Sequence, residues 1–114
     1  VSIHGDGNQV RAFCHVSDIA NAFSFALTKG DNEAFNVGNN FEPISIKELA
    51  NRIISLTKSK SKIRFISFDD SSRNRREIIN RAPDISKAEK MLGYKPIISL
   101  DEGLTRVIKK HRKC

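Results

Sequence analysis

Residues 3–18 read IHGDGNQVRAFCHVSD, and this stretch decides how the rest of the chain is interpreted. A glycine-rich turn separates two short apolar runs, residues 2–4 and 10–14, which we expect to be strands around that turn. Ser17 is expected to cap a helix that begins directly after the second strand. A forked, permanently charged guanidinium near a helix start suits a phosphate or pyrophosphate ligand. Arg11, on the second strand, is therefore the first candidate binding residue.

The composition excludes several classes of protein. The chain has 114 residues, 39% hydrophobic and 29% charged, and it holds no apolar run of about 18 residues that would predict a membrane span. The first residues are polar, so no secretory signal is predicted, and two distant cysteines do not make a disulfide framework. Three histidines without nearby ligand partners predict no metal site. We expect a soluble protein in a reducing, cytoplasmic setting.

Charge is distributed unevenly along the chain. The formal net charge is +7, and residues 58–114 hold 16 basic and 7 acidic residues, whereas residues 1–57 hold 4 basic and 6 acidic ones. Such asymmetry indicates an anionic partner, either nucleic acid or a diphosphate ligand. Solvated lysines on helix faces are the structural alternative.

Strand-like and helix-like segments alternate along the chain. Ser45–Glu48 and Ser99–Glu102 are capping boxes, each of which predicts the start of a helix. Helices are expected at about residues 17–28, 45–58 and 84–92 and after Ser99, and further strands at residues 34–38 and 63–68. This order predicts an α/β fold, a small lobe in which short strands alternate with about four helices.

Three helices carry apolar stripes, and that of the helix at about residues 45–58 comprises Ile46, Leu49, Ala50, Ile53 and Ile54. The stripe of the first helix comprises Ile19, Ala22, Phe23, Ala26 and Leu27, and the last helix offers Leu104, Val107 and Ile108.

Several motifs follow one another in an order that resembles one known family. They are Gly5-Asp6-Gly7-x-Gln9-x-Arg11-x-Phe13-x-x-Val16-x-Asp18, Phe35–Gly38, Ser45-Ile46-x-Glu48-Leu49, Arg81–Ala88, Leu92–Pro96 and Leu100–Leu104. The set is similar to the substrate-binding lobe of NAD-dependent epimerases and dehydratases, the extended short-chain dehydrogenases that act on nucleotide sugars. The match covers nearly the whole chain with several motifs in register.

The resemblance implies both a ligand and the residues that bind it. In this family an N-terminal Rossmann domain binds NAD, and a smaller C-terminal lobe closes over a nucleotide diphosphate sugar. Arg11 would contact the diphosphate, and Arg81 would line the pocket near the diphosphate or the sugar. One of Arg73, Arg75 and Arg76 would reach the diphosphate from the other side. The alternatives are surface charge and, for Arg81, an ion pair with a nearby acid.

The chain departs from the family pattern in two respects: it has neither the glycine-rich dinucleotide loop nor the catalytic Tyr-x-x-x-Lys pair. Gly5-x-Gly7 is followed by neither a third glycine nor an immediate helix, so it is a turn and not a dinucleotide loop. The only tyrosine is Tyr94, and Ile98 stands where the family's Tyr-x-x-x-Lys pair would place the lysine. We therefore assign no catalytic residue and no cofactor-binding residue to this chain.

The expectation is thus a single partial domain, residues 1–114, without the N-terminal Rossmann domain. It would be the nucleotide-sugar-binding portion of an NAD-dependent epimerase, dehydratase or decarboxylase of carbohydrate metabolism. NAD would belong to the full-length enzyme, with none bound to this chain, and the partners would be a nucleotide diphosphate sugar and the Rossmann domain. The nucleotide, the sugar, the choice among the three reactions and the oligomeric state stay open.

A second class of function is a small basic module that binds nucleic acid or another protein. One tyrosine and no tryptophan leave little aromatic surface for base stacking, and no helix concentrates its arginines on one face. The sequence therefore favours the nucleotide-sugar hypothesis.

Overall fold

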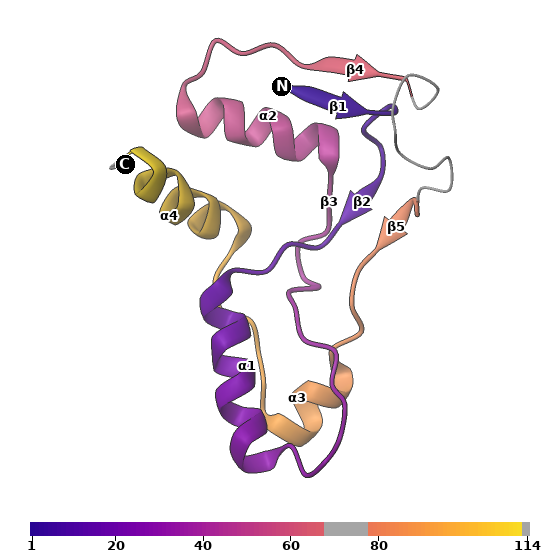
Figure 1. Ribbon diagram of the computed structural model, residues 1–114, viewed down its shortest axis with the longest axis vertical. Coiled ribbons are helices and arrows are strands. Elements are labelled where there is room, and N and C mark those ends of the chain that lie inside the picture. The colour runs from indigo at the N-terminus through magenta and orange to yellow at the C-terminus, as the bar shows by residue number, and fades with distance from the viewer. Residues whose placement is uncertain (68–77, 113–114) are drawn as a thin grey trace. The chain divides into compact units, whose positions relative to one another are not determined.

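The computed structural model describes residues 1–67 and 78–112, and the chain divides into two units (Figure 1). Unit 1 comprises Val1–Arg11 and Ile44–Arg81, and unit 2 comprises Ala12–Pro43 and Ala82–Cys114. Each unit therefore combines two stretches that lie far apart in the sequence.

The described residues of unit 1 form five short strands and one helix. They are β1 (Ser2–His4), β2 (Val10–Arg11), β3 (Ile44–Ser45), α2 (Ile46–Thr57), β4 (Arg64–Ile66) and β5 (Asn80–Arg81). β1 pairs with β4 in parallel, with Ile3 opposite Phe65. The other three strands form a second sheet in the order β3-β2-β5, antiparallel between β2 and β3 and parallel between β2 and β5.

The strands predicted on either side of the glycine-rich turn are present as β1 and β2, but they belong to different sheets. The turn carries the chain from one sheet to the other, because the Gly5 N–H donates to the Ile66 carbonyl (2.8 Å) and the Gly7 carbonyl accepts from the Lys47 N–H (3.0 Å). Gly7 has φ +76°, and a Cβ there would lie 2.9 Å from the Lys47 Cβ. The turn therefore packs against the start of α2 instead of folding β2 back on β1, and the strand expected at residues 10–14 is only Val10–Arg11.

The first capping box forms as predicted on its serine side. Ser45 is the N-cap of α2, and its hydroxyl accepts a hydrogen bond from the Glu48 N–H (3.2 Å). The helix ends at Thr57, and Lys58 follows in the left-handed conformation. This boundary agrees with the predicted end near residue 58.

Ser45→Ala is expected to destabilise α2 by about 1 kcal/mol, because the Glu48 N–H loses its acceptor. Hydrogen exchange at the Glu48 amide measures this loss directly. Ser55→Ala, at an exposed position inside the same helix, is the control and should change little. Equal exchange rates in the two variants would contradict a capping role for Ser45.

Up to residue 112, where the described chain ends, unit 2 forms three helices: α1 (Val16–Lys29), α3 (Ser86–Leu92) and α4 (Leu100–Arg112). α1 packs against α3, as Figure 1 shows. Gly93 ends α3 at φ +69°, a conformation that glycine adopts without strain. The buried cluster between these elements comprises Ala22, Ile85, Ala88, Leu92 and Tyr94.

Residues 93–99 join α3 to α4, and buried and exposed positions alternate strictly from residue 92 to residue 100. The buried members are Leu92, Tyr94, Pro96, Ile98 and Leu100. A period of two is typical of extended chain with one face against a core. This segment therefore supplies part of the core of unit 2 without being a strand.

The helix starts in unit 2 differ from the predictions by a residue or two. His15, and not Ser17, is the N-cap of α1, and its Nδ1 accepts a hydrogen bond from the Ser17 N–H (3.2 Å). Ile85 is the N-cap of α3. The predicted cap, Asp84, lies one residue before Ile85, and its carboxylate accepts a hydrogen bond from the Ser86 N–H (3.0 Å). At Ser99 the predicted cap forms, because its hydroxyl accepts from the Glu102 N–H (3.3 Å).

The strand expected at residues 34–38 is not present. Phe35 and Val37 pack against the buried cluster, and the Gly38 carbonyl accepts a hydrogen bond from the Tyr94 hydroxyl. No described residue pairs with this segment as a strand. The apolar side chains of this segment pack in the core, but its backbone lacks the interstrand hydrogen bonds that define a strand.

The apolar stripe of α1 is covered over only part of its width. Ala22 is buried, whereas Phe23 is 68% and Leu27 is 88% exposed. The spacing correctly predicted a helix, but the described residues do not cover the whole stripe. The predicted class, short strands with four helices, is confirmed.

Candidate anion-binding site

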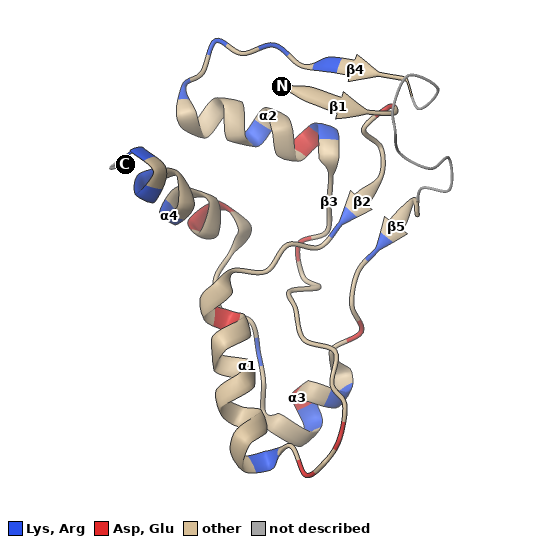
Figure 2. Cartoon of the chain, viewed as in Figure 1, with Lys and Arg blue, Asp and Glu red and all other residues tan. Residues whose placement is uncertain are grey.

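The parallel pairing of β2 with β5 places two of the predicted binding residues side by side. Arg11 lies directly opposite Arg81 in the strand register. Neighbouring strands are about 4.8 Å apart, and paired positions present their side chains to the same face of the sheet. Figure 2 shows basic positions on both strands. Two arginines separated by 70 positions in the sequence thus occupy paired positions on neighbouring strands.

Arg11 is held by its own neighbours. Its Nη1 donates to the carbonyls of Val10 and Ile78, each at 2.8 Å, and the residue is half-buried. The second bond ties the guanidinium to the chain just before β5. Arg81 is exposed. The site therefore combines one arginine in a fixed position with one that is free to adjust.

Like charges directly opposite each other on neighbouring strands repel and destabilise the pair. An anion between two guanidinium groups removes this cost and gains charge-assisted hydrogen bonds, which are the strong ones. The arrangement is therefore suited to a phosphate or diphosphate. Arg73, Arg75 and Arg76, the other predicted ligands, lie outside the described residues.

The single tyrosine does not have the properties of a catalytic acid or base. Tyr94 is 1% exposed, and its hydroxyl donates to the Gly38 carbonyl at 2.8 Å. Burial is the main cause that raises the pKa of Tyr94 well above its usual value. This side chain is a neutral core residue that ties residues 38 and 94 together.

Cys14 lies beside Tyr94, with its Sγ 3.7 Å from the Tyr94 hydroxyl. Burial raises the pKa of the Cys14 thiol, the charge of Asp18 raises it further, and the tyrosine hydrogen bond opposes both. A thiol that stays protonated is a poor nucleophile. Packing is the role that these contacts support, as the sequence indicated.

Asp18 has a larger role than the first-turn acid that the sequence suggested. It is 1% exposed, and its two carboxylate oxygens accept hydrogen bonds from the N–H groups of Ile97 and Ile98, both at 3.1 Å. Asn39 is also buried, and its Nδ2 donates to the Ile98 carbonyl (3.3 Å). Together these two side chains bond to the N–H groups of Ile97 and Ile98 and to the Ile98 carbonyl. The sequence signal was the presence of Asp18 in the family motif.

Two further findings concern the described residues only. They contain no group of three or more His, Cys, Asp or Glu side chains that could hold a metal ion. None of their helices is both long enough and apolar enough to cross a membrane.

The short strands and helices of the described residues define an α/β protein, in which the pairing of β2 with β5 brings two arginines into register. Residues 1–107 match the family model described as GDP-mannose 4,6 dehydratase, and the chain belongs to that family.

Named relatives agree with this assignment. UDP-glucuronic acid decarboxylase 1 of Danio rerio is 37% identical over 110 residues, which are 95% of this chain and 24% of the relative. The crystal structure of UDP-glucose 4-epimerase from Thermotoga maritima with UDP-glucose is 30% identical and has a TM-score of 0.88, over 99% of this chain and 35% of that one. That of UDP-glucuronic acid 4-epimerase from Bacillus cereus in complex with NAD is 27% identical, with a TM-score of 0.75, over 96% of this chain and 34% of that one.

The resemblance to NAD-dependent epimerases and dehydratases is thus confirmed, and the chain spans about a quarter to a third of the length of these relatives. The family match gives no support to the alternative of a nucleic-acid-binding module.

Proposed function

We propose that this chain is the nucleotide-sugar-binding portion of an NAD-dependent epimerase, dehydratase or decarboxylase. The observation that carries the proposal is the register of Arg11 opposite Arg81. A diphosphate offers two adjacent anionic groups, which matches two guanidinium groups on neighbouring strands. The relatives act on UDP-sugars, so a nucleoside diphosphate sugar is the ligand class that we assign.

The role of this chain in the reaction is positional. The full enzyme oxidises a sugar hydroxyl, lets the keto intermediate react and then reduces it again. Arg11 and Arg81 hold the diphosphate, which does not react, so its binding energy orients the sugar for the chemical step. This role is the same whether the keto intermediate is epimerised, dehydrated or decarboxylated.

NAD supplies hydride transfer when it is bound to the full enzyme. The described residues do not fit it, because the Gly5-x-Gly7 turn leads into β2 and not into a helix N-terminus. We therefore assign no step of the hydride transfer to a residue of this chain. The 114 residues alone are expected to bind no NAD and to be inactive.

Isothermal titration calorimetry of the chain with UDP-glucose, UDP and uridine tests the ligand class. We expect weak binding of UDP-glucose and UDP and none of uridine, because the arginines recognise phosphate. Arg11→Ala and Arg81→Ala should each weaken binding about tenfold, the equivalent of one charge-assisted hydrogen bond.

Arg64→Ala is the matched control, since Arg64 is an exposed arginine on β4 of the same unit. Arg11→Lys keeps the charge and removes the fork, and should bind less well than the wild type. Equal losses in Arg64→Ala and Arg11→Ala, or tight binding of NAD to this chain, would contradict the proposal.

A further inference from the structure

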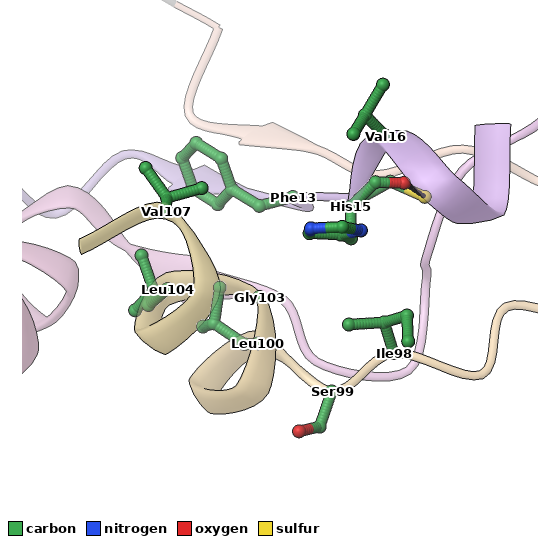
Figure 3. Close-up of a pocket in the computed structure, with 10 residues that line it drawn as sticks. Phe13, His15, Val16, Ile98, Ser99, Leu100, Gly103, Leu104 and Val107 are labelled. Atoms are coloured by element: carbon green, nitrogen blue, oxygen red, sulfur yellow. Dashed lines mark hydrogen bonds between the residues drawn. The ribbon is translucent and has the colours of Figure 1, made fainter. Parts of the chain in front are cut away.

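Unit 2 has an open groove of about 260 Å³ between residues 13–16 and α4, with Phe13 and Val107 at one end (Figure 3). Its described lining contains no Asp, Glu, Lys or Arg. A diphosphate is bound most strongly by charged donors, so this groove does not suit the proposed ligand. The part of the described chain that can respond to an anion is β5 in unit 1.

β5 gains little stability from burial. It lies at the edge of its sheet, and β2 is its only partner in the part of the chain that the structure describes. Both of its residues are exposed, which is true of no other described strand of unit 1. Ile78 and Ile79, directly before it, are 54% and 70% exposed. Strands are stabilised mainly by half-buried side chains and cross-strand contacts, and β5 has few of either.

The other neighbour of β2 is held much more firmly. Ile44 of β3 lies opposite Arg11 and is 4% exposed. β3 runs directly into the capped helix α2, where the Ile46 N–H donates to the Gln9 carbonyl (3.1 Å). A buried side chain and a helix therefore stabilise the β3 side of the sheet, whereas the β5 side has neither.

Opposing interactions act between β2 and the segment 78–81, which we call the strap. The Val10 N–H donates to the Ile79 carbonyl (2.7 Å), and Arg11 Nη1 donates to the Ile78 carbonyl (2.8 Å). Arg11 also lies opposite Arg81, and like charges at paired positions destabilise the pairing of two strands. Pairing of the strap with β2 therefore depends on the charge that lies between the two arginines.

We propose that the strap closes on β2 when a phosphate or diphosphate binds between Arg11 and Arg81, and that it opens far more often without this anion. The anion replaces repulsion with charge-assisted hydrogen bonds, and it can contact both arginines only while β5 is paired. A ligand that binds one conformation alone shifts the equilibrium toward that conformation. The inference rests on the proposed function, because it adds a conformational response to the same diphosphate site.

Amide hydrogen exchange, followed by NMR, measures the opening of the strap. The Val10 N–H is bonded to the strap, whereas the Ile46 N–H bonds on the opposite side of β2 and is the internal control. At a UDP concentration of about ten times its Kd, the Val10 amide should exchange about tenfold more slowly, and the Ile46 amide should be unchanged. Equal protection of the two amides, or none at Val10 with UDP bound, overturns the proposal.

Arg81→Glu tests the strap without any ligand. A carboxylate opposite Arg11 converts a repulsive pair into an attractive one, so the Val10 amide should exchange about fivefold more slowly than in the wild type. UDP should add no further protection to this variant.

Arg64→Glu is the matched control, because it makes the same change of charge at an exposed position of β4, opposite Ser2. Its Val10 amide should exchange as in the wild type. The strap proposal is wrong if Arg64→Glu and Arg81→Glu have the same exchange rate at Val10.

The two proposals fail in different ways. Binding of UDP, measured by calorimetry, with an unprotected Val10 amide counts against the strap alone. Protection of Val10 by inorganic pyrophosphate without binding of UDP supports the strap and contradicts the nucleotide ligand. Absence of binding by both anions overturns both proposals.

Discussion

Asp18→Ala is expected to lower the free energy of unfolding of this chain by about 3 kcal/mol. The part-buried N–H of Ile97 and the buried N–H of Ile98 would both lose their acceptor, and an unsatisfied buried donor costs about 1–3 kcal/mol. The loss is concentrated where residues 92–100 meet α1, so it should destabilise unit 2 as a whole. Urea unfolding followed by far-ultraviolet circular dichroism measures it.

Asp18→Asn keeps the size of the side chain but removes one of its two acceptor oxygens, so it tests the hydrogen bonds alone. An amide has one acceptor oxygen, and its NH2 group would face a second N–H donor, so this variant should also be clearly destabilised. Glu89→Gln, at an exposed acid on α3, is the control and should change stability little. Equal stabilities of Asp18→Asn and Glu89→Gln would show that the two hydrogen bonds contribute nothing.

The hydroxyl of Tyr94 is expected to stay protonated in the folded chain at pH values where a free tyrosine ionises. Its pKa is raised in the fold above the ordinary value of 10.0, chiefly by burial. The folded state therefore holds a proton that the unfolded state loses above pH 10. Stability is consequently unaffected below pH 10 and falls as the pH rises above it.

This prediction is directly measurable because Tyr94 is the only tyrosine and the chain has no tryptophan. Tyrosinate absorbance during an alkaline titration should appear only together with unfolding, as followed by circular dichroism. Tyr94→Phe loses the hydrogen bond to Gly38, which costs about 1 kcal/mol, and should lack the alkaline decrease that ionisation of Tyr94 causes. Gradual ionisation in the folded chain, with a pKa near 10, would contradict the buried position of this hydroxyl.

The sequence and the tertiary structure contributed different information about the candidate site. The resemblance of the motifs predicted Arg11 and Arg81 as binding residues, and their pairing on β2 and β5 is what the structure adds. No local pattern could supply that register, because it joins segments 70 positions apart. Asp18 was underestimated for a similar reason, since its partners are the backbone groups of residues 97 and 98.

The sequence by itself determined the features whose physical causes lie within a few residues. The caps at Ser45 and Ser99 bond to an N–H three positions away, and the glycine at position 93 ends a helix through its own backbone freedom. The tertiary structure alone decided which strands pair and which apolar faces are covered. β1 joins β4 across 62 positions instead of joining the adjacent β2, and Leu27 on a regular apolar stripe stays exposed. Pairing and burial depend on which distant elements pack together, and periodicity within one element carries no information about its neighbours.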